Sequence, residues 1–125
     1  MRSSPVTVEA PILVVDDDTD LRETLGELLE EEGYEPRLFE NGRTALEFLR
    51  HGERPRLILL DLMMPEMNGW QFREEQLKDA GLKDIPVVVM TASRGIEANP
   101  ISAQEILYKP VGLGELIDAV ERNSR

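Results

Sequence analysis

The sequence predicts an α/β fold in which short buried strands alternate with amphipathic helices. Three runs are apolar throughout, which is typical of strands buried on both faces: Ile12–Val15, Leu57–Leu60 and Val87–Met90. The segments between these runs show the spacing of amphipathic helices. Because parallel strands are usually joined by helices, the alternation favours a parallel sheet with helices on both faces.

The first helix is expected after the first strand. Four leucines from Leu21 to Leu29 recur at i, i+4, i+7 and i+8, and Gly33 provides a C-terminal stop. A weaker strand, Glu35–Glu40, follows this helix. A second helix is expected from an N-cap at Asn41 to about Gly52.

The second half of the chain continues the alternation. A third helix, less clearly amphipathic, is expected from Trp70 to about Asp79. The tract Ser93–Ser102 contains Gly95 and Pro100, so the fourth helix is predicted to be short or distorted. The last units are a weaker strand and a helix with an apolar stripe at i, i+3, i+4 and i+7. They are Glu105–Lys109 and the segment beginning at Leu113.

Length and composition predict one globular domain. The chain has 125 residues, of which 41% are hydrophobic, and a formal net charge of -11. That charge has the wrong sign for direct nucleic-acid binding through phosphates. The absence of cysteine excludes disulfides, thiolate nucleophiles and cysteine zinc sites.

No signal peptide or apolar run long enough for membrane insertion is present, so a cytoplasmic location is expected. Residues 1–10 are predicted to be a flexible N-terminal tail and residues 11–125 the domain.

Polar residues follow the predicted strands where those strands end. Asp16 and Asp17 follow the first, Asp61 the third, Thr91 the fourth, and Lys109 closes the fifth. Ligands of open parallel sheets bind outside the carboxyl ends of the strands. Clustered carboxylates repel one another unless a hard cation lies among them, and oxygen-rich sites suit Mg²⁺. The sequence therefore predicts a Mg²⁺ site at this edge.

The neighbouring residues Asp18, Thr19 and Asp20 have a different explanation. Asp, Ser and Thr cap helix N-termini, and acidic residues in the first turn complement the helix dipole. We therefore assign these three residues to the start of the first helix rather than to the metal site.

Four segments in order, VVDDD, LLDLMMPEMNG, VVVMTAS and LYKP, resemble the receiver domain of bacterial two-component response regulators. The resemblance extends from about Ile12 to Arg122. It implies a flavodoxin-like, doubly wound five-stranded parallel sheet in the order 2-1-3-4-5, with five flanking helices.

The resemblance implies a role for each polar residue. Asp61 is the expected phosphoacceptor, and a carboxylate that attacks phosphorus forms an acyl phosphate. Lys109 is expected to pair with the phosphoryl oxygens, and Thr91 to donate its hydroxyl to one of them.

The same resemblance implies the metal ligands and the partners. Mg²⁺ is expected to bind Asp17, Asp61 and the backbone carbonyl of Met63 directly, and Asp16 either directly or through a water. The phosphoryl group is expected to come from a sensor histidine kinase or a histidine phosphotransfer protein. No output domain follows in this sequence, so a downstream protein target is expected to recognise the phosphorylated surface, unless the sequence is a fragment of a longer chain. The resemblance thus implies a phosphoacceptor domain and not an enzyme, with at most intrinsic autophosphorylation and autodephosphorylation.

Two features depart from the family pattern. Receivers usually carry an aromatic residue three positions before the lysine, where this sequence has Ile106. Tyr108 is expected to point to the opposite strand face from Lys109, which makes it a poor substitute. The interval from Thr91 to Lys109 is also short by about one helical turn. These departures leave open a degenerate receiver that acts as a phosphorylation-independent protein-interaction module.

Two rival readings match the acidic run less well. A Mg²⁺-dependent haloacid-dehalogenase-like phosphatase needs D-x-D-x-[TV], but Asp16 and Asp18 are followed by Asp20. An EF-hand would place Asp16, Asp18, Asp20 and Glu27 at calcium-binding positions, but Leu21 stands where the loop needs glycine.

Overall fold

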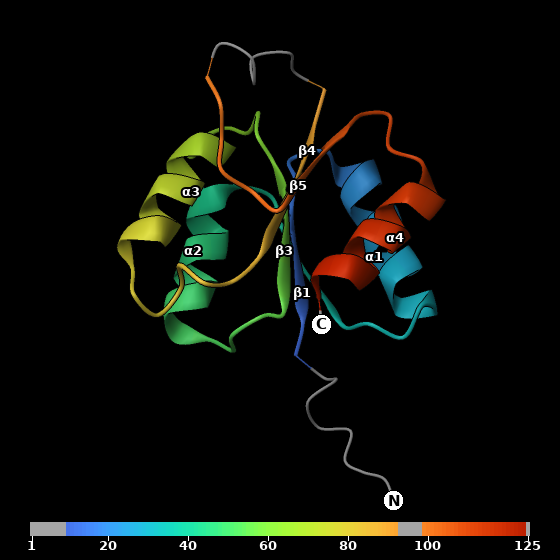
Figure 1. Cartoon of the computed structure of the whole chain (residues 1–125), viewed down its shortest axis with the longest axis horizontal. Coiled ribbons are helices and arrows are strands. Elements are labelled where there is room, and N and C mark those ends of the chain that lie inside the picture. Colours follow the sequence, from blue (N-terminus) through green and yellow to red (C-terminus); the bar gives the residue numbers. More distant parts are fainter. Residues whose placement is uncertain (1–9, 93–98, 125) are drawn as a thin grey trace, which may run out of the picture.

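Five parallel strands form a single sheet in the computed structural model, which describes residues 10–92 and 99–124. The strand order is β2-β1-β3-β4-β5, which confirms the predicted order (Figure 1). The strands are β1 (Ile12–Val15), β2 (Pro36–Phe39), β3 (Leu57–Asp61), β4 (Val87–Thr91) and β5 (Glu105–Tyr108).

The described residues contain four helices, which cover both faces of the sheet. Helices α2 and α3 lie on one face, and α1 and α4 lie on the other (Figure 1). Their bounds are α1 (Thr19–Glu31), α2 (Gly42–His51), α3 (Gly69–Lys78) and α4 (Leu113–Asn123). None of these helices is long and apolar enough to cross a membrane.

The expected fourth helix of the family falls largely outside the described residues, since residues 93–98 are not among them. The described end of that tract, residues 99–102, is not helical. The predicted N-terminal tail lies outside as well, except for Ala10. Both predictions therefore stay predictions.

Burial explains why three strands gave the stronger sequence signal. Strands β1, β3 and β4 are buried at every position, because helices cover both faces and strands flank both edges. The edge strands β2 and β5 are less buried, and each contains half-buried residues and one exposed residue. An edge strand needs no continuous apolar run, so its pattern is weaker.

Local capping residues set the helix ends. The side chain of Asp18 accepts a hydrogen bond from the backbone N–H of Leu21 and caps α1, as predicted. Asn41 caps α2 in the same way, through the N–H of Thr44. Gly33 has a φ of 90°, a conformation that favours glycine, and it ends α1.

Helix α3 is only weakly amphipathic because its buried face contains polar side chains. Gln76 is fully buried and donates hydrogen bonds to the carbonyls of Leu82 and Ile85. Arg73 donates to Gln76 at 2.8 Å and to the carbonyl of Ser102 at 2.8 Å. These bonds satisfy buried polar groups and join α3 to the segments on either side of β4.

Helix α4 is joined to β5 by a two-pronged ion pair. Arg122 donates to both carboxylate oxygens of Glu105 at 2.8 Å, and Asn123 donates to the same carboxylate at 2.7 Å. The hydrogen bond from Arg122 lowers the pKa of Glu105 to about 2. This contact fixes the end of α4 against the edge of the sheet.

Candidate functional site

The polar residues singled out in the sequence lie at the carboxyl edge of the sheet. Asp16 directly follows β1, Asp61 and Thr91 are the last residues of β3 and β4, and Lys109 directly follows β5. The strands β1, β3, β4 and β5 are consecutive neighbours in the sheet, so parallel pairing places these ends side by side.

Three carboxylates form a group able to hold a metal ion. Asp16, Asp17 and Asp61 each offer one oxygen, and these oxygens lie within 4.8 Å of one another. It is the one such group found in the described part of the chain. Asp16 and Asp61 are buried, whereas Asp17 is exposed. Three hard oxygen ligands, one of them open to solvent, fit Mg²⁺, which keeps several of its waters.

Asp16 is held in place by hydrogen bonds to both of its carboxylate oxygens. Oδ1 accepts from the backbone N–H of Asp18 at 2.9 Å, and Oδ2 accepts from Lys109 Nζ at 2.9 Å. These bonds compensate for the complete burial of the side chain. The carboxylate is thereby oriented before any ligand binds.

Lys109 connects two of the carboxylates. Its Nζ lies 2.9 Å from Asp16 Oδ2 and 3.5 Å from Asp61 Oδ1. Burial lowers the pKa of Lys109, but the hydrogen bond and charge of Asp16, with the charge of Asp61, outweigh burial and raise it. The ammonium therefore stays charged beside the oxygen of Asp61.

The surroundings of Asp61 change the pKa of its carboxyl group. Its pKa is raised from 3.8 to about 6, first by burial and then by the negative charge of Asp16. Lys109 and a hydrogen bond from the backbone N–H of Met63 act in the opposite direction. The carboxylate is thus short of counter-charge, which is the condition in which added positive charge stabilises a site most.

Met63 and Thr91 complete the set of predicted site residues. The Met63 side chain is 58% exposed, so the loop after β3 turns it to solvent while its backbone faces Asp61. Thr91 is fully buried at the end of β4, and its carbonyl accepts from the backbone N–H of Lys109 at 2.9 Å. The proposed roles of the Met63 carbonyl and the Thr91 hydroxyl remain predictions.

Two residues that support the site were not singled out in the sequence. Arg22 reaches back from α1 and donates to the backbone carbonyl of Asp16 at 2.7 Å. Gly69 begins α3 so close to β3 that an added Cβ would lie 2.7 Å from the carbonyl oxygen of Asp61. A signal for Arg22 was present, since it is the one cation in the strongly acidic α1.

The structure also places the two residues that depart from the family pattern. Ile106 is half-buried and packs against the core between the sheet and α2 and α3. Tyr108 is 52% exposed and belongs to neither core cluster. Neither side chain therefore provides a buried aromatic ring beside Thr91.

Comparison with known proteins agrees with this geometry. Residues 12–121 match the response regulator receiver domain family. The response regulator MprA of Mycolicibacterium vanbaalenii is 38% identical over 110 residues, which cover 85% of this chain and 46% of that protein. The chain thus spans about half the length of this relative.

Solved structures of receiver domains are similar as well. The signal receiver domain of a histidine kinase from Syntrophus aciditrophicus has a TM-score of 0.83 at 32% identity, covering 90% of this chain and 88% of that one. The response regulator TrrA from Thermotoga maritima, in complex with Mg²⁺-BeF, has a TM-score of 0.80 at 36% identity. That match covers 90% of this chain and 97% of TrrA. The five-stranded fold, the acidic cluster at the strand ends and the family match together establish that this chain belongs to the response regulator receiver domain family.

Proposed function

We propose that the chain is a Mg²⁺-dependent phosphoacceptor that receives a phosphoryl group on Asp61. The observation that carries this proposal is the position of the buried Asp61 carboxylate. It lies 3.5 Å from Lys109 Nζ, with oxygens of Asp16 and Asp17 within 4.8 Å. Phosphoryl transfer depends mainly on positioning and charge neutralisation, and this arrangement provides both.

Asp61 acts as the nucleophile in the proposed transfer. One of its carboxylate oxygens forms a bond to phosphorus as the bond from phosphorus to the donor nitrogen breaks. The imidazole of the donor histidine keeps the electron pair of that bond, and the product is an acyl phosphate on Asp61. The family of this chain supports a sensor histidine kinase or a histidine phosphotransfer protein as the donor.

The residues around Asp61 stabilise the added charge. The Lys109 ammonium, already between Asp16 and Asp61, pairs with a phosphoryl oxygen. The buried Thr91 hydroxyl donates to another. Asp16, Asp17, Asp61 and the carbonyl of Met63 would hold the cation. When bound, Mg²⁺ supplies the positive charge that offsets these carboxylates and the incoming phosphoryl oxygens.

The phosphoryl group stays on the protein and changes its surface. The domain therefore serves in signalling and not as a catalyst. A downstream protein target recognises that surface. The net charge of -11 disfavours direct contact with nucleic-acid phosphates. A cytoplasmic location follows from the proposed kinase partner.

Incubation with acetyl phosphate and Mg²⁺ should add one phosphoryl group, measured by intact-mass spectrometry. The same incubation with EDTA should add none, because the uncompensated carboxylates repel an anionic donor. If a chain shown to bind Mg²⁺ gained no mass from acetyl phosphate, the phosphoacceptor function would be wrong. That outcome would favour the phosphorylation-independent interaction module.

Phosphorylation should alter the segment Ala92–Ala103 more than the fifth strand. Side chains of α3 hold the described end of this segment: Trp70 Nε1 donates to the carbonyl of Asn99 at 2.7 Å, and Arg73 to that of Ser102. Ile106 has no ring to rotate inward. Beryllofluoride with Mg²⁺ should therefore reduce amide hydrogen exchange across Ala92–Ala103 more than around Ile106.

Hydrogen-exchange mass spectrometry with and without beryllofluoride tests this expectation. The variant Trp70→Phe tests the contact with α3, because it keeps an aromatic ring at this position but removes the hydrogen bond to the carbonyl of Asn99. It should increase exchange near Asn99 in the absence of beryllofluoride. Equal protection from exchange in Ala92–Ala103 and around Ile106, or a change confined to β5, would show that the switch runs through the fifth strand.

A further inference from the structure

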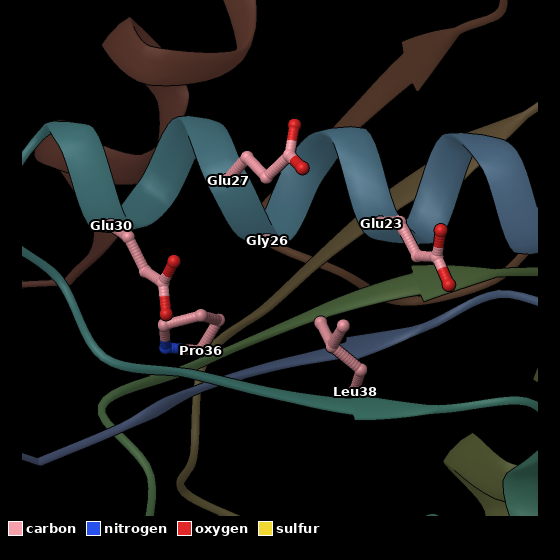
Figure 2. A pocket seen from close by; sticks show the side chains of 6 residues that line it. All are labelled: Glu23, Gly26, Glu27, Glu30, Pro36 and Leu38. Carbon is pink, nitrogen blue, oxygen red and sulfur yellow. The ribbon is translucent and has the colours of Figure 1, made fainter.

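A groove of about 290 Å³ lies between helix α1 and the edge strand β2, and it shares no residue with the phosphorylation site. Figure 2 shows its lining, with α1 above the strand. The residues are Glu23, Gly26, Glu27, Glu30, Pro36 and Leu38.

The floor of the groove is apolar. Leu38 is 39% exposed, one of the few large hydrophobic side chains on the described surface. Gly26 faces it from α1, and a Cβ added there would lie 3.3 Å from both terminal carbons of Leu38. The missing side chain lets α1 approach β2 and leaves the Leu38 side chain accessible from outside.

The wall of the groove is acidic. Glu23, Glu27 and Glu30 recur at i, i+4 and i+7, so they form one stripe along α1 (Figure 2). None of the three makes an ion pair with another described residue. Like charges at this spacing repel, and acidic residues at a helix C-terminus oppose its dipole. Glu30 lies in the last turn of α1, where the dipole argument applies. No ion pair among the described residues offsets the negative charge of the stripe, which favours a cationic ligand.

The arrangement of the groove residues limits which kind of positively charged ligand can bind there. The glutamate oxygens are not close enough together to form a metal-binding group, since the one such group among the described residues is at the phosphorylation site. A partner strand is also disfavoured at the β2 edge. Pro36 has no N–H to offer, and Arg37 donates to the Pro36 carbonyl at 3.4 Å. With a metal ion and a partner strand disfavoured, the occupant that best fits the acidic stripe is a helix with a row of cationic side chains.

We propose that this groove binds a basic amphipathic helix of a partner protein. Lysine or arginine residues at helical spacing pair with Glu23, Glu27 and Glu30, and an apolar side chain between them packs on Leu38. The charge complementarity and the apolar contact together set the register of the bound helix. Because the groove is separate from Asp61, binding does not require phosphorylation.

The probe is a lactam-constrained helical peptide with lysines at i, i+4 and i+7 around one leucine. Titrated into the ¹⁵N-labelled full chain at low salt, it should produce saturable shifts centred on the amides of Gly26 and Leu38. Raising the salt concentration should weaken the affinity, because exposed ion pairs are screened. A peptide with glutamate in place of lysine is the matched probe control and should not bind.

Replacing the three glutamates tests the groove itself. The triple variant Glu23→Gln, Glu27→Gln and Glu30→Gln should weaken peptide binding by about tenfold or more. The matched control changes three exposed acids that have no ion pair among the described residues, by the substitutions Glu74→Gln, Asp84→Asn and Glu115→Gln. It alters the net charge equally and should keep most of the affinity.

A second measurement separates binding from folding. The triple glutamine variant should resist urea better than the wild type while binding the peptide less well, because removing the repulsion helps the helix. Its labelling by acetyl phosphate should be unchanged, so a failure here is distinct from a failure of the phosphoacceptor function. The proposal is overturned if the shifts spread over the whole acidic surface or if both triple variants lose affinity equally.

Discussion

Asp61→Asn should abolish labelling by acetyl phosphate and, without Mg²⁺, should make the protein more stable. The loss of labelling follows because an amide is not a nucleophile towards phosphorus. The gain in stability follows from the raised pKa of Asp61, which is about 6 against an ordinary value of 3.8. A difference of this size corresponds to at most about 3 kcal/mol at neutral pH. The lost attraction between Lys109 and Asp61 offsets part of it.

The stability effect has a definite pH dependence. In the folded protein Asp61 binds a proton below pH about 6, whereas in the unfolded chain it stays ionised down to pH about 3.8. The stabilisation from the protonated carboxyl is therefore fully present below pH 3.8 and is lost as the pH rises through 6. The advantage of Asp61→Asn over the wild type should thus be largest near neutral pH and vanish by about pH 4.

Urea unfolding at several pH values, with EDTA present, measures the difference between the two proteins. Asp84→Asn is the matched control, because Asp84 is exposed and makes no ion pair among the described residues. It should change neither labelling nor the pH dependence. Stoichiometric labelling that persisted in Asp61→Asn would show that the phosphoryl group goes to another residue.

Asp17→Ala should lose measurable Mg²⁺ binding and become more stable in the absence of metal. Asp17 contributes one of the three carboxylate oxygens within 4.8 Å, and its charge also raises the pKa of Asp61. Removing it takes away a metal ligand and part of the repulsion together. Isothermal titration with Mg²⁺ and urea unfolding in EDTA measure the two effects.

The neighbouring substitution Asp18→Ala is the control for this prediction. Asp18 caps α1 through the N–H of Leu21 at 3.1 Å, so its loss should cost about 1 kcal/mol of stability while Mg²⁺ binding is kept. Adjacent aspartates should therefore change stability in opposite directions. Unchanged Mg²⁺ affinity in Asp17→Ala would mean that Asp17 is not a ligand.

The sequence by itself determined the elements and the chemistry of the site. Continuous apolar runs identified β1, β3 and β4, and Asp18 and Asn41 were identified as helix caps because capping is a local interaction. The site residues were found because they lie at or just after the ends of strands, and parallel strands end at one edge. The strand order and the roles of Asp61 and Lys109 came from the resemblance to receiver domains.

Only the tertiary structure decided features that depend on contacts between distant segments. The polar face of α3 looked like weak amphipathicity until Arg73 and Gln76 were seen to satisfy buried carbonyls around β4. The groove needed Leu38 of an edge strand to meet Gly26 of a helix. Periodicity reports which face of an element is buried, but not what lies opposite, because that depends on how the elements pack in space.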